Sequence, residues 1–447
     1  MNVVASSLRT VGVLALLQVA LPVNAALTAV ALTRGALLGT SSSEAADRTA
    51  GASRTVLISG GKMTKALQLA RSFHAAGHRV VLVESAKYRL TGHRFSRAVD
   101  VFHTVPSPQD PGYAEALRTI VEQEGVDVYV PVCSPLASYY DALAAEVLAP
   151  LCEVLHLDAE MVATLDDKER FAALAASLGL GVPESHRITD PRQVAAFDFA
   201  ARPGRSFILK SLAYDPVHRL DLTLLPRPTP EETADFARSK PMTPSNPWVL
   251  QEFVVGQEYC THSTVRDGAV QVYCCCESSA FQINYAMRDK PEIEEWVTRF
   301  VGELGLTGQV SFDFIESADG RVHAIECNPR THSAITMLYD HPDVARAYLE
   351  PYADSERPVV TPTATSRPTY WIYHELWRLL RRPGDARHRL RVIGEGKDAI
   401  FDWADPLPFL MVHHVQLPWL LLQNLRHGTG WVRVDFNIGK LVEPAGD

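Results

Sequence analysis

The sequence has no excess of positive charge. Its 447 residues include 43 lysines and arginines against 52 aspartates and glutamates, a formal net charge of -9 at pH 7. A nucleic-acid backbone is bound through clustered basic side chains, so the charge balance argues against nucleic acid as a partner. The hydrophobic fraction of 47% can build cores in two or three packed units and is not that of a disordered chain.

Cysteine is scarce, and its arrangement argues against two structural uses. The seven cysteines are an odd number and include the run Cys274 to Cys276, which suits neither a disulfide framework nor a tetrahedral metal site. A cytoplasmic, reducing location is therefore expected. Adjacent strand residues point to opposite faces, so these cysteines are predicted to be small buried side chains.

Charge is missing altogether from Thr10 to Thr33, a run dominated by Val, Leu and Ala. Its length is sufficient to cross a bilayer, and we favour an uncleaved anchor or interfacial helix that associates residues 10–33 with the cytoplasmic face of a membrane. An exported signal peptide and a buried helix are the alternatives. The stretch Thr40 to Ser53 is rich in Ser, Ala and Gly, which predicts a linker. Residues 1–50 are therefore expected to form a hydrophobic segment followed by its linker.

The next segment has the pattern of a βαβ unit, which predicts a Rossmann-like parallel-sheet domain over residues 51–160. The expected elements are strand Thr55–Ser59, a turn at Gly60–Lys62, helix Met63–Ala76, strand Val80–Glu84, helix Tyr113–Glu124 and strand Val126–Val132. The turn lacks both the full G-x-G-x-x-G spacing and a G-K-[ST] sequence. A dinucleotide site with Glu84 on a ribose and a P-loop are therefore disfavoured against a sharp structural turn.

The strongest chemical signal is a predicted hairpin. Ser311–Ile315 and Ala324–Arg330 flank an Asp319-Gly320 turn, which places Asp313 opposite Glu326, with Asn328 two residues further on the same face. Three oxygen-bearing side chains would then converge, as Mg²⁺ requires, with Mn²⁺ as an alternative metal. An exposed polar face is the competing interpretation.

These residues resemble the metal-binding hairpin of ATP-grasp ligases. The resemblance implies an α/β (α+β) fold with an ATP-grasp domain over residues 161–340 and a C-terminal extension over residues 341–447. It also implies that ATP is bound by matching positions earlier in the chain. By that resemblance Lys168 and Lys210 contact the phosphates, the hinge Gln251, Glu252, Phe253 and Val254 holds adenine, and Glu258 takes the ribose hydroxyls.

A narrower resemblance is to the mycosporine-glycine synthetases. It is carried by Gly60–Leu67, Pro131–Pro135, Cys260–Arg266, Cys327–Ser333, Tyr370–Glu375 and Asp435–Lys440. It implies joining of glycine to 4-deoxygadusol with release of ADP and phosphate. Arg330, His332 and Ser333 are the expected catalytic and acceptor residues, because they directly follow the hairpin.

Two departures from better-known ATP-grasp ligases concern the phosphate lid and the oxyanion. No glycine-rich lid follows Lys210, where the chain reads Ser211 to Pro216, and Ser311 stands where D-alanine ligases carry an arginine. Two rival functions are a general carboxylate-amine ligase and a membrane-associated nucleotide-binding regulator without turnover.

Overall fold

The computed structural model describes residues 3–38, 53–212, 218, 221–278, 284–350 and 358–443, with the side chains of residues 3–5 and 38 left out. Most of the linker expected at Thr40 to Ser53 and most of the lid segment after Ser211 lie outside the described residues. The described chain confirms the expected α/β class.

The N-terminal sheet is parallel, with strand order β3-β2-β1-β4-β5. Its strands are β1 (Thr55–Ile58), β2 (Arg79–Ser85), β3 (Val101–Val105), β4 (Val128–Val130) and β5 (Glu153–Val154). The covering elements are α3 (Thr64–Ala75), η1 (Ala86–Tyr88), η2 (Gly92–Phe95), α4 (Tyr113–Glu124) and α5 (Ser138–Leu148). The predicted βαβ order is confirmed, although β4 ends before Pro131, which has no amide hydrogen to extend the ladder.

The turn after β1 is structural. Gly60 has φ +69°, and a Cβ there would lie 2.0 Å from the carbonyl oxygen of Val132. Only glycine therefore lets this turn approach the chain that follows β4. Glu84 accepts a hydrogen bond from the Lys62 amide at 2.9 Å and pairs with its ammonium at 3.4 Å, so that carboxylate is already engaged by the turn.

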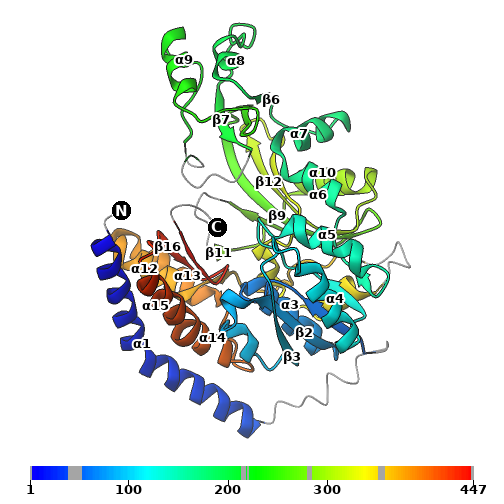
Figure 1. The fold of residues 1–447 in the computed structure, drawn as a ribbon, viewed down its shortest axis with the longest axis vertical. Helices are drawn as coiled ribbons and strands as arrows, with labels where there is room; N and C mark the ends of the chain where they lie inside the picture. Colours follow the sequence, from blue (N-terminus) through cyan, green and yellow to red (C-terminus); the bar gives the residue numbers. More distant parts are fainter. Residues whose placement is uncertain are drawn as a thin grey trace.

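Two antiparallel sheets follow, with orders β6-β8-β7 and β10-β9-β12-β13 (Figure 1). The elements up to β8 are α6 (Ala159–Asp166), α7 (Lys168–Ser177), β6 (Ser185–Ile188), α8 (Pro191–Ala195), β7 (Phe207–Ser211), α9 (Pro230–Arg238) and β8 (Trp248–Glu252). Those of the second sheet are β9 (Gly256–Arg266), β10 (Ala269–Glu277), α10 (Pro291–Glu303), β12 (Gly308–Ser317) and β13 (Val322–Asn328).

Alternating burial sets the faces of the second sheet. Phe312 of β12 packs 5.3 Å from the rings of both Trp296 and Phe300 on α10. On β10, Cys274 and Cys276 enter one hydrophobic cluster and Cys275 enters another. The prediction that these cysteines are small buried side chains on opposite faces is confirmed.

Strand β11, which precedes α10 in the chain, and the last part of the chain supply the remaining short strands and helices. They are β11 (Asn284–Tyr285), η3 (Ser333–Leu338), α11 (Val344–Leu349), β14 (Thr369–Tyr370), α12 (Ile372–Arg381), η4 (Pro383–Asp385), α13 (Ala386–Glu395), β15 (Lys397–Asp398), α14 (Leu407–Met411), the π-helix η5 (Val412–Gln416), α15 (Leu417–His427), β16 (Arg433–Asp435) and β17 (Lys440–Val442). Strands β11, β14 and β15 form one small sheet, and β16 pairs with β17.

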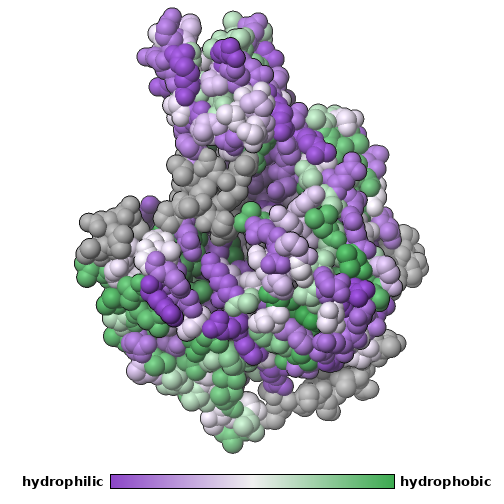
Figure 2. Space-filling model, viewed as in Figure 1, coloured by the Kyte–Doolittle hydropathy of each residue, from purple (hydrophilic) through white to green (hydrophobic). Residues whose placement is uncertain are grey.

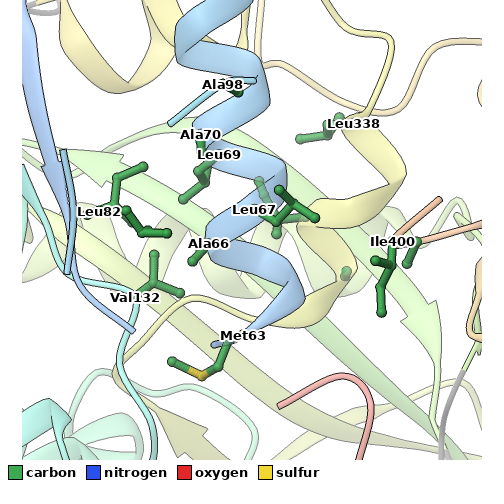
Figure 3. Close-up of a cluster of buried hydrophobic side chains, with 14 of the residues drawn as sticks. Met63, Ala66, Leu67, Leu69, Ala70, Leu82, Ala98, Val132, Leu338 and Ile400 are labelled. Atoms are coloured by element: carbon green, nitrogen blue, oxygen red, sulfur yellow. The ribbon is translucent and has the colours of Figure 1, made fainter. Parts of the chain in front are cut away.

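Helix α3 lies at the centre of the largest core (Figure 3). Leu67 and Ala70 of α3 are fully buried, and Leu338 from η3 and Ile400 from the C-terminal part pack into the same cluster. Leu17, Val56, Cys274, Ile335 and Trp371 also belong to it. All four sequence segments therefore share one core, and the boundaries at residues 50, 160 and 340 stay predictions.

The N-terminal apolar run forms one helix, α1 (Val3–Leu38), which continues through Pro22 and lies along α14 and α15 (Figure 1). Its length and composition would allow it to cross a membrane, and only 17% of its most apolar window is buried. Most of the surface of α1 is exposed, so the alternative of a buried helix is wrong. The stretch Leu407 to Leu425, in contrast, contributes buried side chains such as Phe409, Leu417 and Leu421.

Candidate active site

The predicted hairpin is confirmed in its register. Asp313 pairs with Glu326 and Ser311 with Asn328, and the register shifts immediately after Asp313. Because Phe314 then pairs with Ala324, Ile325 is the extra residue of a β-bulge and is only half-buried. The bulge lies beside the two acids, where it turns the strand locally.

Two lysines from other elements face these acids. The ammonium of Lys168, the first residue of α7, lies 3.2 Å from a carboxylate oxygen of Glu326. Lys210 of β7 lies within electrostatic range of Glu326, Lys168, Glu258 and Asp313, whose charges act on its pKa. Burial is the larger effect and lowers the pKa of Lys210.

The two carboxyl groups are driven in opposite directions. Burial and then the neighbouring Glu326 charge raise the pKa of Asp313 to about 7. Burial opposes ionisation of Glu326 too, but Lys168 and Lys210 outweigh it and lower the pKa of Glu326 to about 2. Glu326 is therefore negatively charged at neutral pH, whereas Asp313 needs a further positive charge nearby to ionise fully.

Asn328 and Arg330 extend the polar cluster. The amide nitrogen of Asn328 donates to Asp313 at 3.3 Å, while its amide oxygen accepts from Arg330. The Arg330 guanidinium also donates to Asp166, at the end of α6, at 3.2 Å. Arg330 thus lies within the site and at the same time braces the hairpin against α6.

The donor set suits a magnesium ion held together with phosphate oxygens. Within residues 3–38, 53–212 and the later described ranges, no three or more His, Cys, Asp and Glu side chains gather in a metal-binding group. The hairpin instead offers two carboxylates and one amide, and Mg²⁺ is commonly held by one or two carboxylates with phosphates and water. The raised pKa of Asp313 has the same implication, because a cation there would relieve the repulsion from Glu326.

The hinge residues differ from one another in their surroundings. Gln251 is buried on β8, and its side chain donates to the Ile325 carbonyl at 3.4 Å. Glu252 is paired with Arg205, whose hydrogen bonds lower the pKa of Glu252. The side chain of Glu252 therefore stabilises the small sheet.

The hinge backbone is partly engaged. The amides of Glu252 and Phe253 donate to the carbonyls of Glu184 and Ser206, both at 2.8 Å. An adenine edge would therefore use other hinge groups, including those of Val254. Glu258 is the third residue of β9, is exposed, and lies opposite Ile315.

The acceptor segment Arg330 to Ser333 is held from several sides. The His332 amide donates to Nδ1 of His262 at 3.2 Å, and Nδ1 of His332 accepts from the Ala334 amide at 3.2 Å. The His332 ring meets Tyr285 edge-on at 5.4 Å, and Ser333 is buried beside it. The structure thus brings the predicted acceptor residues next to the hairpin.

Comparison with known sequences found no matching protein-family model and no matching curated protein. Solved structures do match. N5-carboxyaminoimidazole ribonucleotide synthetase in complex with ADP has a TM-score of 0.53, 14% identity, and covers 74% of this chain and 85% of its own. Biotin carboxylase from Campylobacter jejuni with β-γ-ATP has a TM-score of 0.51, 16% identity, and covers 67% of this chain and 72% of its own.

The chain has the ATP-grasp fold. Lys210 comes from the first antiparallel sheet, whereas Asp313 and Glu326 come from the second. The candidate site therefore draws residues from both antiparallel sheets and from α7.

Sequence reasoning missed Lys65 of α3. Its ammonium is buried and donates to the carbonyls of Cys133 at 3.1 Å and Thr331 at 2.5 Å. Burial, and then the charge of Arg330, lower the pKa of Lys65 to about 7. A lysine in the first turn of a helix beside a Gly-Gly turn was the available signal, but only the fold shows that it ties the N-terminal sheet to the acceptor segment.

A cavity of about 300 Å³ adjoins this junction, at the carboxyl edge of the parallel sheet. Its wall includes Gly60, Lys62, Ser134, Asp141 and Lys440. Ser138, one turn before Asp141, donates to the Pro329 carbonyl at 2.7 Å. The cavity therefore borders the same contact between the N-terminal sheet and the hairpin end.

Proposed function

We propose that this protein is an ATP-dependent ligase that phosphorylates an oxygen acid and joins it to an amine, releasing ADP and phosphate. The observation that carries the proposal is the Asp313, Glu326 and Asn328 hairpin, faced by Lys168 and Lys210 within an ATP-grasp fold. The nucleotides in the two similar structures, ADP and β-γ-ATP, support ATP as the phosphoryl donor.

Each residue group has a defined task in this reaction. Lys168 and Lys210 balance the charge of the transferred phosphate, and Asp313, Glu326 and Asn328 would hold Mg²⁺, which supplies further neutralisation of the phosphate oxygens. The acid oxygen forms a bond to the γ-phosphorus as the bond to ADP breaks. The amine then forms a bond to the activated carbon, and phosphate leaves.

The acceptor that we propose is 4-deoxygadusol, with glycine as the amine and mycosporine-glycine as the product. The support is the sequence resemblance in the acceptor segment and in the other segments between Gly60 and Lys440. An enolised 1,3-dicarbonyl is a vinylogous carboxylic acid, so its oxygen can be phosphorylated and displaced in the same way. Arg330 would hold the developing oxyanion, and His332 and Ser333 the hydroxyl or carboxylate groups.

A general carboxylate-amine ligase is the competing proposal, and it requires only the ATP-grasp fold and the shared ATP site. The deciding experiment measures ADP release and product mass with 4-deoxygadusol plus glycine, against a panel of carboxylate and amino-acid pairs. ADP release and an enaminone product only with 4-deoxygadusol support the narrower reaction. Turnover only with carboxylates supports the general ligase, and ATP binding without ADP release in any mixture refutes both.

A further inference from the structure

Helix α1 has its polar and apolar faces reversed relative to a soluble helix. The buried positions toward the protein are Ser6, Thr10, Leu17, Asn24, Thr28 and Ala31, four of which are polar. The exposed positions include Leu8, Val11, Leu16, Val19, Val23, Val30, Leu32 and Leu37. A helix that turns Ser, Thr and Asn inward and Leu and Val outward is typical of an apolar environment around the protein.

The inward seam is built from specific contacts along the helix. Arg9 donates to the carbonyl of Val432 at 2.7 Å and lies 3.9 Å from the centre of the Trp431 ring. Asn24 contacts the Tyr373 hydroxyl at 2.6 Å. Arg34, near the other end, lies 5.6 Å from the centre of the Trp403 ring.

These contacts determine how the helix can lie in a membrane. Arg9 and Arg34 are separated by roughly 37 Å along a helix at 1.5 Å per residue, and both hold α1 to the folded body. A helix docked over such a length cannot cross a bilayer unless the body enters with it. It can, however, lie in the plane of the membrane with its outer face in the lipid.

Helix α12 adds a second apolar stripe. Trp377 and Leu380 are 52% and 74% exposed, and Leu376 is exposed beside them. The same helix turns Glu375 inward, where it is fully buried and paired with Arg389 at 3.4 Å. Helix α12 therefore contacts the protein through one face and exposes an apolar stripe on the other.

A concentration of positive charge accompanies this stripe. Residues 376–392 contain six arginines and one aspartate, in a chain whose net charge is -9. Exposed members are Arg381, Arg382, Arg387 and Arg391. Basic side chains beside an apolar stripe match the interface of a bilayer that carries anionic headgroups.

We propose that α1, α12 and α13 form one membrane-binding face that holds the protein on an anionic phospholipid bilayer, with α1 lying in the membrane plane. Figure 1 shows α1 beside α12 and α15, with α13 packed on α12, and hydrophobic side chains gather over α1 in Figure 2. A second copy fits this face less well, because a two-fold contact would bring the arginine clusters of both copies together.

The test is flotation of the full-length protein with vesicles of phosphatidylcholine alone or mixed with phosphatidylglycerol. We expect binding to the anionic vesicles that weakens with salt. Replacing both Arg381 and Arg382 with Ser should lower partitioning to anionic vesicles roughly thirtyfold, with little effect on phosphatidylcholine. Val19→Glu and Leu380→Glu should lower binding to both.

Matched controls are Leu151→Glu and Arg192→Ser, which change exposed residues on other parts of the molecule. Thermal unfolding checks that every variant is folded. The proposal is wrong if both vesicle types bind equally, if neither binds, or if the controls reduce binding as much. A salt-resistant dimer that Leu380→Glu dissociates, without vesicle binding, would assign the face to a second copy instead.

The orientation of α1 has its own test. A protease-sensitive tag placed before residue 1 should stay protected in intact bacterial spheroplasts that express the protein, since an in-plane helix leaves both ends in the cytoplasm. Cleavage of the tag, or of the folded body, from outside would show a spanning helix and refute the in-plane arrangement. Neither experiment depends on ligase turnover.

Discussion

Glu326 and Asn328 are the residues whose replacement most directly tests the metal site. Glu326→Gln keeps a hydrogen-bonding group toward Lys168, and Asn328→Ala removes the amide that contacts Asp313. Each change should reduce Mg²⁺-dependent turnover by more than roughly a hundredfold with little change in thermal stability. Asp319→Asn, in the exposed turn of the same hairpin, is the control and should leave turnover unchanged.

Arg330 lies within the candidate site and also donates a hydrogen bond to Asp166 at the end of α6. If the forked guanidinium holds the oxyanion, Arg330→Lys should lose turnover, because lysine keeps the charge without the fork. Asp166→Asn removes the charged partner of the brace and should retain turnover. His332→Ala should raise the apparent KM for an organic substrate. Unchanged kinetics in the Arg330 and His332 variants would move the acceptor site elsewhere.

Lys65 provides a pH-dependent test of the contact between α3 and the acceptor segment. Its pKa in the folded state is about 7, below its ordinary value of 10.5, so the unfolded chain binds more protons between these values. Stability should therefore rise with pH in that window, with a slope of up to about 1.4 kcal/mol per pH unit from this residue.

The measurement is urea unfolding of the wild-type protein and Lys65→Met over this pH range. The difference in free energy of unfolding should grow in favour of the wild type as the pH rises. Lys87→Met, which changes an exposed lysine, should show the wild-type slope. Parallel pH profiles for the wild type and Lys65→Met would contradict a lowered pKa.

At the scale of elements, the start of α7 positions Lys168, the lysine that we propose contacts the phosphates. The Asp167 side chain accepts hydrogen bonds from the amides of Glu169 and Arg170 at 3.0 and 3.1 Å, and Lys168 is the next residue. Asp167→Ala should cost about 1 kcal/mol of stability and raise the apparent KM for ATP. Asp158→Ala removes the corresponding cap of α6 and should lower stability without that change in KM.

Most elements near the site could be predicted from local patterns, but contacts between elements far apart in the chain could not. The Asp-Gly turn and the alternation around Phe312 and Phe314 predict the hairpin register. The bulge at Ile325 was not predictable, because the sequence also permits a regular ladder. The pairing of Glu252 with Arg205 was not predictable either, because it joins the end of β8 to the loop before β7, and only the fold brings these two segments together.

For the whole molecule, α3 joins the N-terminal sheet to the C-terminal part in one core. Ile400→Ala should lower the free energy of unfolding by about 2 to 5 kcal/mol and shift the whole unfolding curve. Leu425→Ala, at a partly exposed position on α15, should change stability by less than about 0.5 kcal/mol. A separate early transition confined to the C-terminal part would show that the parts unfold independently.

The sequence by itself determined the local chemistry of this protein: the βαβ unit, the hairpin with its two acids and amide, and the buried cysteines on opposite faces. These follow from periods of two and 3.6 residues and from turn residues, which act over a few positions. Only the tertiary structure decided that Lys168 meets Glu326, that Lys65 reaches Thr331, and that α1 turns its polar seam inward. These contacts join segments far apart in the chain, and their geometry depends on how complete elements pack rather than on any local pattern.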